Sequence, residues 1–196
     1  MDPLDRFVDG CRNAGPRAGR TRVVAVDGPS GSGKTTLAPH LADRFGGCPV
    51  VRMDAIHPGW DGLDDAVPRL VEWVLEPLAA GRGARYRRFD WDRGAYAEWH
   101  EVPDSPFLVV EGVGSGARRC APYLTGLVWL DAPAEIRFAR AMARDGDGYL
   151  PHWERWAAQE ERHFRRERTR ARAGLVLDGG APVGGVATPR AHGEPY

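Results

Sequence analysis

The sequence predicts an α/β domain built around a mostly parallel sheet. Short apolar runs rich in valine alternate along the chain with longer segments whose apolar residues recur at helical spacing. An acidic residue stands just past four of these runs, at Asp27, Asp54, Glu111 and Asp131. Parallel strands end at one edge of their sheet, so these carboxylates should gather there. A chain of 196 residues with 42% hydrophobic content can bury one core of this kind.

The predicted elements follow one another in a strand–helix order. The apolar runs predict strands at residues 23–26, 49–53, 84–89, 107–110, 127–130 and 175–177. Helical spacing predicts helices at 34–45, 63–80, 134–144 and 151–172, the last either continuous or broken. Residues 1–20 precede the domain as a short helix or a flexible lead-in, the domain itself covers 21–178, and the Gly- and Pro-rich residues 179–196 predict a flexible tail.

Charge and cysteine content limit the classes of partner. The chain has 27 basic and 27 acidic residues, which argues against an overall electrostatic affinity for nucleic acid or membrane. Its three cysteines lack metal-ligand spacing, and no apolar stretch approaches a membrane span. We therefore expect a cytoplasmic protein that binds a small molecule, with a homodimer left open.

A glycine-rich loop between the first strand and the first long helix predicts a phosphate site. Within the loop Gly28–Thr36, residues Gly28–Thr35 match the pattern G-x-x-x-x-G-K-[ST], and Lys34 is the only lysine of the chain. Such a loop directs backbone N–H groups and a helix N-terminus at an anion. We expect ATP, with Mg²⁺, to be bound by Gly28, Ser30, Gly31, Ser32, Gly33, Lys34, Thr35 and Thr36. Lys34 would neutralise phosphate charge and the hydroxyl of Thr35 would ligate the metal.

Two of the strand-end carboxylates are candidates for phosphoryl-transfer chemistry. Asp54 could deprotonate a hydroxyl nucleophile, and Glu111 could hold Mg²⁺ together with Thr35. The alternative for either residue is a turn or capping role at the end of its strand.

Three arginines share one face of the predicted helix 134–144. Arg137, Arg140 and Arg144 recur at intervals of three and four residues. An arginine face of this kind is often only solvated, but next to a phosphate loop it can stabilise a transferring phosphoryl group. Arg140 and Arg144 are therefore the predicted catalytic arginines, beside Asp54 and Lys34.

With these residues in order, the chain resembles the uridine kinase and phosphoribulokinase-like branch of the P-loop kinases over about residues 21–180. The further matching segments are Asp54-Ala55-Ile56-His57, Trp60-Asp61, Phe89-Asp90-Trp91, Val110-Glu111-Gly112 and the arginine helix up to Asp145. The resemblance implies a three-layer sandwich with a five-stranded parallel sheet and a small helical lid at about residues 144–152. It also implies that Asp54 is the catalytic base, that Arg140 and Arg144 reach phosphates, and that Asp61 and Asp90 face the acceptor.

The chain departs from this branch on the acceptor side. After Asp90 the family's histidine is missing and its arginine is moved, to Arg93, while the doubled lid arginine is reduced to Arg140-Ala141. Trp60 and Trp91 flank the predicted acceptor carboxylates and could either stack on the substrate or pack in the core.

These observations favour a small-molecule kinase that phosphorylates a hydroxyl of a nucleoside-like or other polyhydroxylated metabolite. One alternative is a kinase whose acceptor is itself a phosphate, which Arg85, Arg87 and Arg88 could bind. Another is an ATP-binding regulatory protein without an acceptor.

Overall fold

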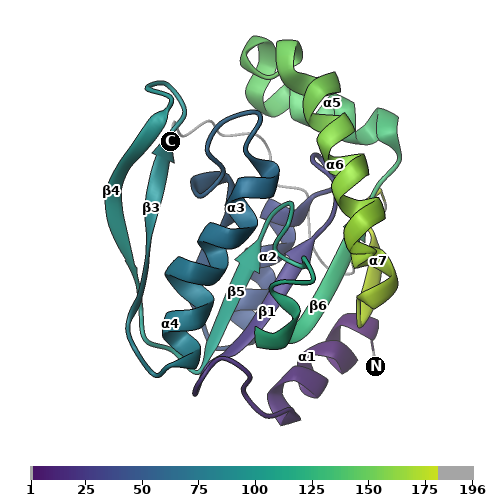
Figure 1. Ribbon diagram of the computed structural model, residues 1–196. Coiled ribbons are helices and arrows are strands. Elements are labelled where there is room, and N and C mark those ends of the chain that lie inside the picture. The colour runs from purple at the N-terminus through teal and green to yellow at the C-terminus, as the bar shows by residue number, and fades with distance from the viewer. Residues whose placement is uncertain (1, 181–196) are drawn as a thin grey trace.

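Five parallel strands form the centre of the computed structural model, which describes residues 2–180 (Figure 1). Their spatial order is β2 (Val50–Arg52), β5 (Phe107–Glu111), β1 (Arg22–Asp27), β6 (Leu124–Asp131) and β7 (Leu175–Asp178). Each neighbouring pair runs parallel. The predicted α/β fold with a five-stranded parallel sheet is confirmed. The tail predicted for residues 179–196 falls almost entirely outside the described residues.

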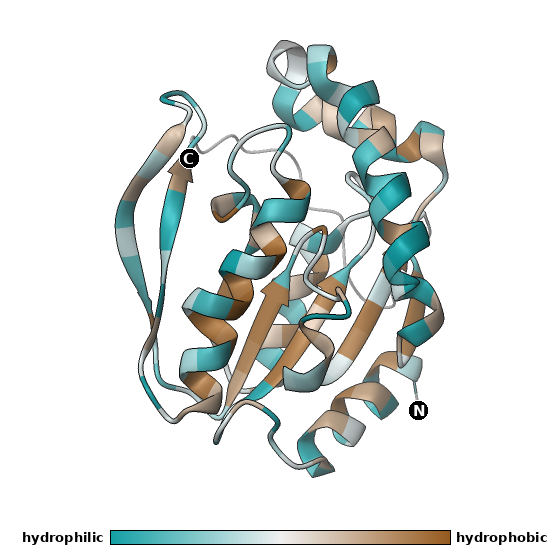
Figure 2. Ribbon diagram, viewed as in Figure 1, coloured by the Kyte–Doolittle hydropathy of each residue, from teal (hydrophilic) through white to brown (hydrophobic). Residues whose placement is uncertain are grey.

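The sheet is buried on both faces because its central strand is apolar at every position from Val23 to Val26. Val23 and Ala25 point to one core, and Val24 and Val26 point to the other. Figure 2 shows the central strands as a hydrophobic layer between helices with polar outer faces.

Helices close both cores. On one face lie α3 (Leu63–Leu70), a π-helical turn (Val71–Leu75) and α4 (Glu76–Ala79). On the other face lie α2 (Lys34–Arg44) and α1 (Pro3–Asn13). The predicted helix 63–80 therefore exists but contains a π-helical turn. The lead-in is a helix that buries apolar side chains in the core.

A two-stranded antiparallel sheet lies beside α3 and was only half predicted. β3 (Ala84–Asp90) corresponds to the expected strand, whereas its partner β4 (Ala95–Val102) was not anticipated. The hairpin attaches through aromatic side chains, including the edge contact of Trp99 with Trp73 at 5.5 Å between ring centroids.

The C-terminal third forms an α5–α6 arm, defined as residues 134–167. It consists of α5 (Ala134–Asp145), 3-10 turns at Gly146–Gly148 and Leu150–His152, and α6 (Trp153–Glu167). The left-handed backbone of Arg168 (φ 54°) ends α6 before α7 (Thr169–Arg172), so the predicted helix 151–172 is broken. Figure 1 shows the arm above the carboxyl edge of the sheet. Among the described helices, none has the length and apolar character needed to cross a membrane.

Candidate functional site

The loop between β1 and α2 has a backbone that only glycine can adopt at its critical positions. Gly28 (φ 145°), Gly31 (φ 77°) and Gly33 (φ 103°) all lie in the positive-φ region. A Cβ at Gly28 would lie 2.0 Å from the carbonyl oxygen of Leu130, and one at Gly31 would lie 2.2 Å from that of Arg137. The loop is therefore pressed against β6 and α5, which fixes its curvature.

The same loop retains polar groups suited to an anion. The N-terminus of α2 at Gly33 has no side-chain cap, so its first-turn N–H groups can bind an external anion. The buried hydroxyl of Ser32 makes no hydrogen bond within the described structure. Lys34 is 7% exposed, and its Nζ donates to the carbonyl oxygen of Pro29 at 2.9 Å, which holds the ammonium over the loop.

The carboxylates of Asp54 and Glu111 lie at the ends of adjacent strands. Arg52, at the end of β2, is in register with Glu111 of β5, and Asp54 follows in a 3-10 turn (Met53–Ala55). Burial and the charge of Asp54 raise the pKa of Glu111, although Lys34 lowers it. Desolvation also raises the pKa of Asp54, but contacts with His57, Arg144 and Lys34 outweigh it and hold this pKa below its ordinary value. Paired carboxylates with pKa values shifted apart are typical of a reaction site.

The arginines of α5 face the loop and the carboxylates. Arg137 Nη1 donates to the carbonyl oxygen of Ser30 at 3.4 Å. Arg140 Nη1 donates to the carbonyl oxygen of Gly179 at 2.8 Å and lies 3.7 Å from the position of a Cβ at Gly33. Arg144 pairs with Asp145 at 2.7 Å, and its charge lowers the pKa of both strand-end carboxylates. This face of α5 is directed at the site.

The two predicted acceptor tryptophans contact each other, and Trp60 also contacts the α5–α6 arm. The ring of Trp60 lies 4.8 Å from that of Trp91 and stacks with Tyr149 at 4.9 Å and His152 at 4.6 Å. Trp91 Nε1 donates to the backbone oxygen of Asp54 at 3.0 Å. Trp91 therefore adjoins Asp54, and Trp60, which contacts Trp91, joins the arm to the body of the molecule.

Two of the other predicted acceptor residues, Asp61 and Asp90, have protein partners. Asp61 pairs with Arg155 of the arm at 3.3 Å. Asp90 accepts a hydrogen bond from the backbone N–H of Arg93 at 3.0 Å, and the Arg93 side chain is exposed in the β3–β4 turn. Their role in acceptor binding stays a prediction.

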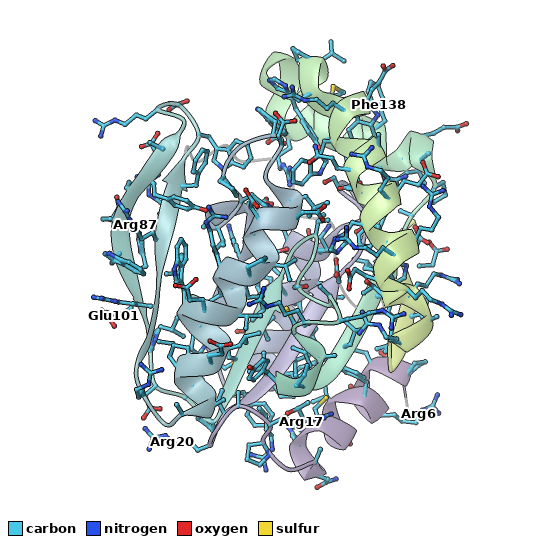
Figure 3. All side chains as sticks on the ribbon, viewed as in Figure 1. Arg6, Arg17, Arg20, Arg87, Glu101 and Phe138 are labelled. Atoms are coloured by element: carbon cyan, nitrogen blue, oxygen red, sulfur yellow. The ribbon has the colours of Figure 1, made fainter. Side chains whose placement is uncertain are left out.

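The three hairpin arginines considered for a phosphate acceptor are engaged within the hairpin. Arg85 lies over the ring of Trp99 at 4.5 Å, and Arg87 donates to the backbone oxygens of Tyr96 and Ala97. Arg88 pairs with Glu98 at 2.7 Å. Figure 3 shows Arg87 on the hairpin, at the side of the molecule away from the arm.

Two buried groups beside the site were not given roles from the sequence. Asp27 is fully buried and accepts N–H bonds from Gly28 (2.7 Å), Gly114 (3.1 Å) and Gly116 (2.9 Å), which ties the phosphate loop to the loop after β5. The position of Asp27 at a strand end was the available signal. His57 is also fully buried; its Nδ1 is 3.7 Å from Asp54 Oδ1 and its Nε2 is 3.2 Å from the carbonyl oxygen of Val113.

A third unpredicted group, Glu160 of α6, hydrogen-bonds the phosphate loop at Ser30. In the sequence it is one acidic residue in a highly charged helix, and nothing local distinguishes it from Glu161.

The donor set fits Mg²⁺ held jointly with a nucleotide. Within residues 2–180 no group of three or more His, Cys, Asp or Glu side chains is placed to hold a metal ion. Mg²⁺ commonly uses one or two protein oxygens and takes its other ligands from phosphates and water. The hydroxyl of Thr35, at the start of α2, and the carboxylate of Glu111 suit that arrangement.

Comparisons with known proteins agree on one class. No family model matches the chain. A curated cytidylate kinase of Edwardsiella ictaluri (strain 93-146) is 30% identical over an alignment 209 positions long, which covers 81% of this chain and 86% of that protein.

Two solved structures share the fold. One is described as a possible uridine kinase from Bacillus stearothermophilus, with a TM-score of 0.62 and 22% identity over 90% of this chain and 97% of the other. The second, provisionally described as a fructose transport system kinase from Silicibacter sp. TM1040, has a TM-score of 0.59 and 23% identity over 90% of this chain and 99% of the other.

Proposed function

This chain belongs to the P-loop kinases, and on that premise we propose that it transfers the γ-phosphoryl group of ATP to a hydroxyl group of a nucleoside-like or other polyhydroxylated small molecule. The observation that carries the proposal is the placement of Asp54. Its carboxylate side chain is 56% exposed at the sheet edge, beside buried Glu111 and within electrostatic reach of Lys34 and Arg144. A carboxylate at that point can reach an acceptor hydroxyl opposite the phosphate loop.

On the donor side, the loop and α5 bind and orient the phosphates. Lys34 and the N-terminus of α2 bind the phosphate chain, and Arg140 and Arg144 stabilise the negative charge of the transferring group. Thr35 and Glu111 would hold Mg²⁺, which would offset phosphate charge.

On the acceptor side, Asp54 acts as the base. It accepts the hydroxyl proton while the acceptor oxygen bonds to the γ-phosphorus and the bond from that phosphorus to the β–γ bridging oxygen breaks, which releases ADP. Its pKa below the ordinary value keeps the carboxylate ionised and able to accept this proton. Trp91, bonded to the backbone of Asp54, forms one wall of the acceptor side.

A second candidate acceptor is a nucleoside monophosphate. The similarity to a cytidylate kinase favours it, and so does Arg52, whose half-exposed guanidinium lies 3.9 Å from Glu111 at the same sheet edge. A phosphate acceptor needs no general base, because its oxygen is already ionised at neutral pH. The two candidates therefore differ in how far they depend on Asp54.

The test is ADP release measured across nucleosides, sugars and nucleoside monophosphates, with the wild type and Asp54→Asn. Loss of a general base should lower turnover of a hydroxyl acceptor by about 10²- to 10⁴-fold while ATP binding is retained. Asp65→Asn, which alters an exposed carboxylate on α3, is the matched control and should behave as the wild type. Near-normal turnover of a hydroxyl acceptor by Asp54→Asn would remove Asp54 as the base. Turnover of monophosphates alone would favour the second candidate.

A further inference from the structure

Glu160 places a buried carboxylate directly on the phosphate loop. It is 3% exposed on α6, and its Oε1 accepts hydrogen bonds from the backbone N–H of Ser30 at 2.9 Å and from the Ser30 hydroxyl at 2.5 Å. Trp156 Nε1, one turn earlier on α6, donates to the same oxygen at 2.8 Å. A side chain 130 residues away along the sequence is thus bonded to a backbone N–H of the loop expected to bind phosphate.

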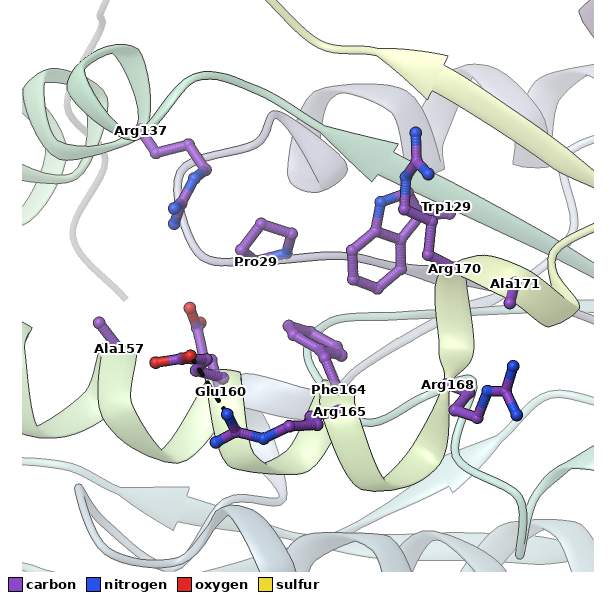
Figure 4. Close-up of a pocket in the computed structure, with 11 residues that line it drawn as sticks. Pro29, Trp129, Arg137, Ala157, Glu160, Phe164, Arg165, Arg168, Arg170 and Ala171 are labelled. Carbon is purple, nitrogen blue, oxygen red and sulfur yellow. Dashed lines mark ion pairs between the residues drawn. The ribbon is translucent and has the colours of Figure 1, made fainter.

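Within the described residues, the groups that hydrogen-bond Glu160 do not neutralise its charge. Its three donors at Ser30 and Trp156 are all uncharged groups. It borders a cavity of about 570 Å³ beside the loop, into which Arg137 of α5 also projects (Figure 4). Burial raises the pKa of Glu160, and the largest opposing influence is the positive charge of Lys34. Lys34, the one lysine of the chain, therefore attracts both the Glu160 carboxylate and the nucleotide phosphates expected at the loop.

We propose that Glu160 is an internal anion that competes with nucleotide phosphates for the loop and so makes nucleotide affinity depend on the charge of the phosphate chain. The inference rests on the proposed function in taking ATP as the ligand of the loop. A phosphate that approaches Lys34 gains attraction from the lysine and repulsion from the carboxylate. The repulsion grows with the number of phosphate charges near Ser30, so it is greatest for ATP.

Occupation of the loop should also affect α6, which carries both Glu160 and Trp156. Binding of ATP weakens the bonds from Ser30 to Glu160, and Trp156 shares the same acceptor oxygen. The indole N–H of Trp156 therefore reports whether the carboxylate stays on the loop. Glu160 thus links occupation of the loop to the position of the α5–α6 arm.

The experiment compares Glu160→Gln with Glu161→Gln by titration calorimetry with ATP, ADP and AMP in the presence of Mg²⁺. Glutamine preserves the shape and an acceptor oxygen but removes the charge. One unit charge facing a phosphate across a protein site changes affinity on the order of tenfold after screening. Glu160→Gln should therefore bind ATP about tenfold more tightly than the wild type, with a smaller gain for ADP and the smallest for AMP. Glu161 is an exposed neighbour paired with Arg165, so its variant should match the wild type.

Each outcome has a separate meaning. Equal affinities in all three proteins, a gain that is the same for every nucleotide, or weaker binding by Glu160→Gln would overturn the inference and leave the proposed function standing. No ATP binding by any of the three proteins would contradict the proposed function and the inference together. Should the variant not fold, the wild type still decides the question. ATP with Mg²⁺ should shift the Trp156 indole N–H resonance, identified by its loss in Trp156→Phe, and an unmoved resonance contradicts the proposal.

Discussion

At the scale of single residues, the phosphate loop depends on backbone space more than on side chains. Gly31 has a positive φ, and its α-carbon faces the backbone of Arg137 in α5. An added methyl group would meet a carbonyl oxygen held by the helix, which cannot move aside as a flexible side chain can. The sequence motif itself reveals the need for glycine, but not the helix that presses against it.

We therefore expect Gly31→Ala to lower the unfolding free energy by more than the strain of the left-handed backbone alone would. Gly94, in the β3–β4 turn, is the matched control because it also has a positive φ (62°) but has nothing within 4 Å of an added Cβ. Gly94→Ala should lose roughly 1–2 kcal/mol of unfolding free energy from the left-handed backbone. Gly31→Ala should lose clearly more and should also weaken ATP binding by at least about tenfold, or 1.4 kcal/mol. Urea unfolding and calorimetry measure both quantities, and equal losses in the two variants would refute the steric argument.

At the scale of elements, α1 is part of the core, although the sequence left open whether this segment is ordered. Leu4, Val8 and Cys11 are all buried, and α1 packs against β6 and β7. Leu4→Ala should lower the unfolding free energy by about 2–4 kcal/mol, because it leaves a cavity in the core that the surrounding side chains fill only in part. Arg6→Ala, on the exposed face of the same helix (Figure 3), should change it by less than about 0.5 kcal/mol. A loss of similar size in both variants in urea denaturation would show that α1 contributes no buried contact.

Buried Glu160 on α6 should make the stability of the fold depend on pH. Burial raises the pKa of this carboxyl above its ordinary 4.5 in the folded chain, and the charge of Lys34 and the hydrogen bonds from Ser30 and Trp156 oppose that rise. The folded chain then binds the proton more tightly than the unfolded chain. Ionisation costs stability as the pH rises above 4.5 through the folded-state value.

Glutamine at position 160 cannot ionise, so the stability of Glu160→Gln relative to the wild type should increase between pH 4 and pH 8. Thermal unfolding of both proteins over that range, without ligand, gives this difference, in which the titration of all other groups largely cancels. Glu161→Gln, which alters the exposed neighbour of Glu160, is the control variant and is measured over the same pH range. A flat profile for Glu160→Gln would mean that the raised pKa makes no contribution to folding.

The elements that the sequence predicted are those whose signals are local. The apolar run at residues 23–26 and the glycine loop after it specify a buried strand and a phosphate site without reference to the rest of the chain. β4 was missed because its polar and aromatic residues are mostly half-buried or exposed and pair only with β3. Glu160 was missed for a related reason. Its partner Ser30 lies 130 residues away, and the helical spacing alone predicts that Glu160 is one more solvated charge on the surface of α6.

At the scale of the whole molecule, the α5–α6 arm is fastened to the body at several points along one seam. Asp61 pairs with Arg155, Gln159 Nε2 donates to the backbone oxygen of Trp60 at 2.6 Å, and Arg166 pairs with Asp64 at 2.7 Å. The resemblance placed a lid at about residues 144–152, which is the tip of this arm. The seam therefore joins the segment that carries Arg140 and Arg144 to the segment that carries Asp54.

Trp60 contributes ring contacts with three residues of the arm to that seam, so its removal should loosen the arm specifically. It stacks with Tyr149 and His152 at the tip, and Trp60→Ala should lower the unfolding free energy by about 2 kcal/mol, since the indole is only partly buried. Limited digestion with trypsin should then cut faster at the arm arginines, above all Arg144 and Arg155, because cleavage requires the arm to open locally. Trp99→Ala, in the β3–β4 hairpin away from the arm, is the control for loss of a half-exposed indole. Cleavage at the arm that is unchanged in Trp60→Ala, or equally accelerated in Trp99→Ala, would show that Trp60 does not hold the arm to the body.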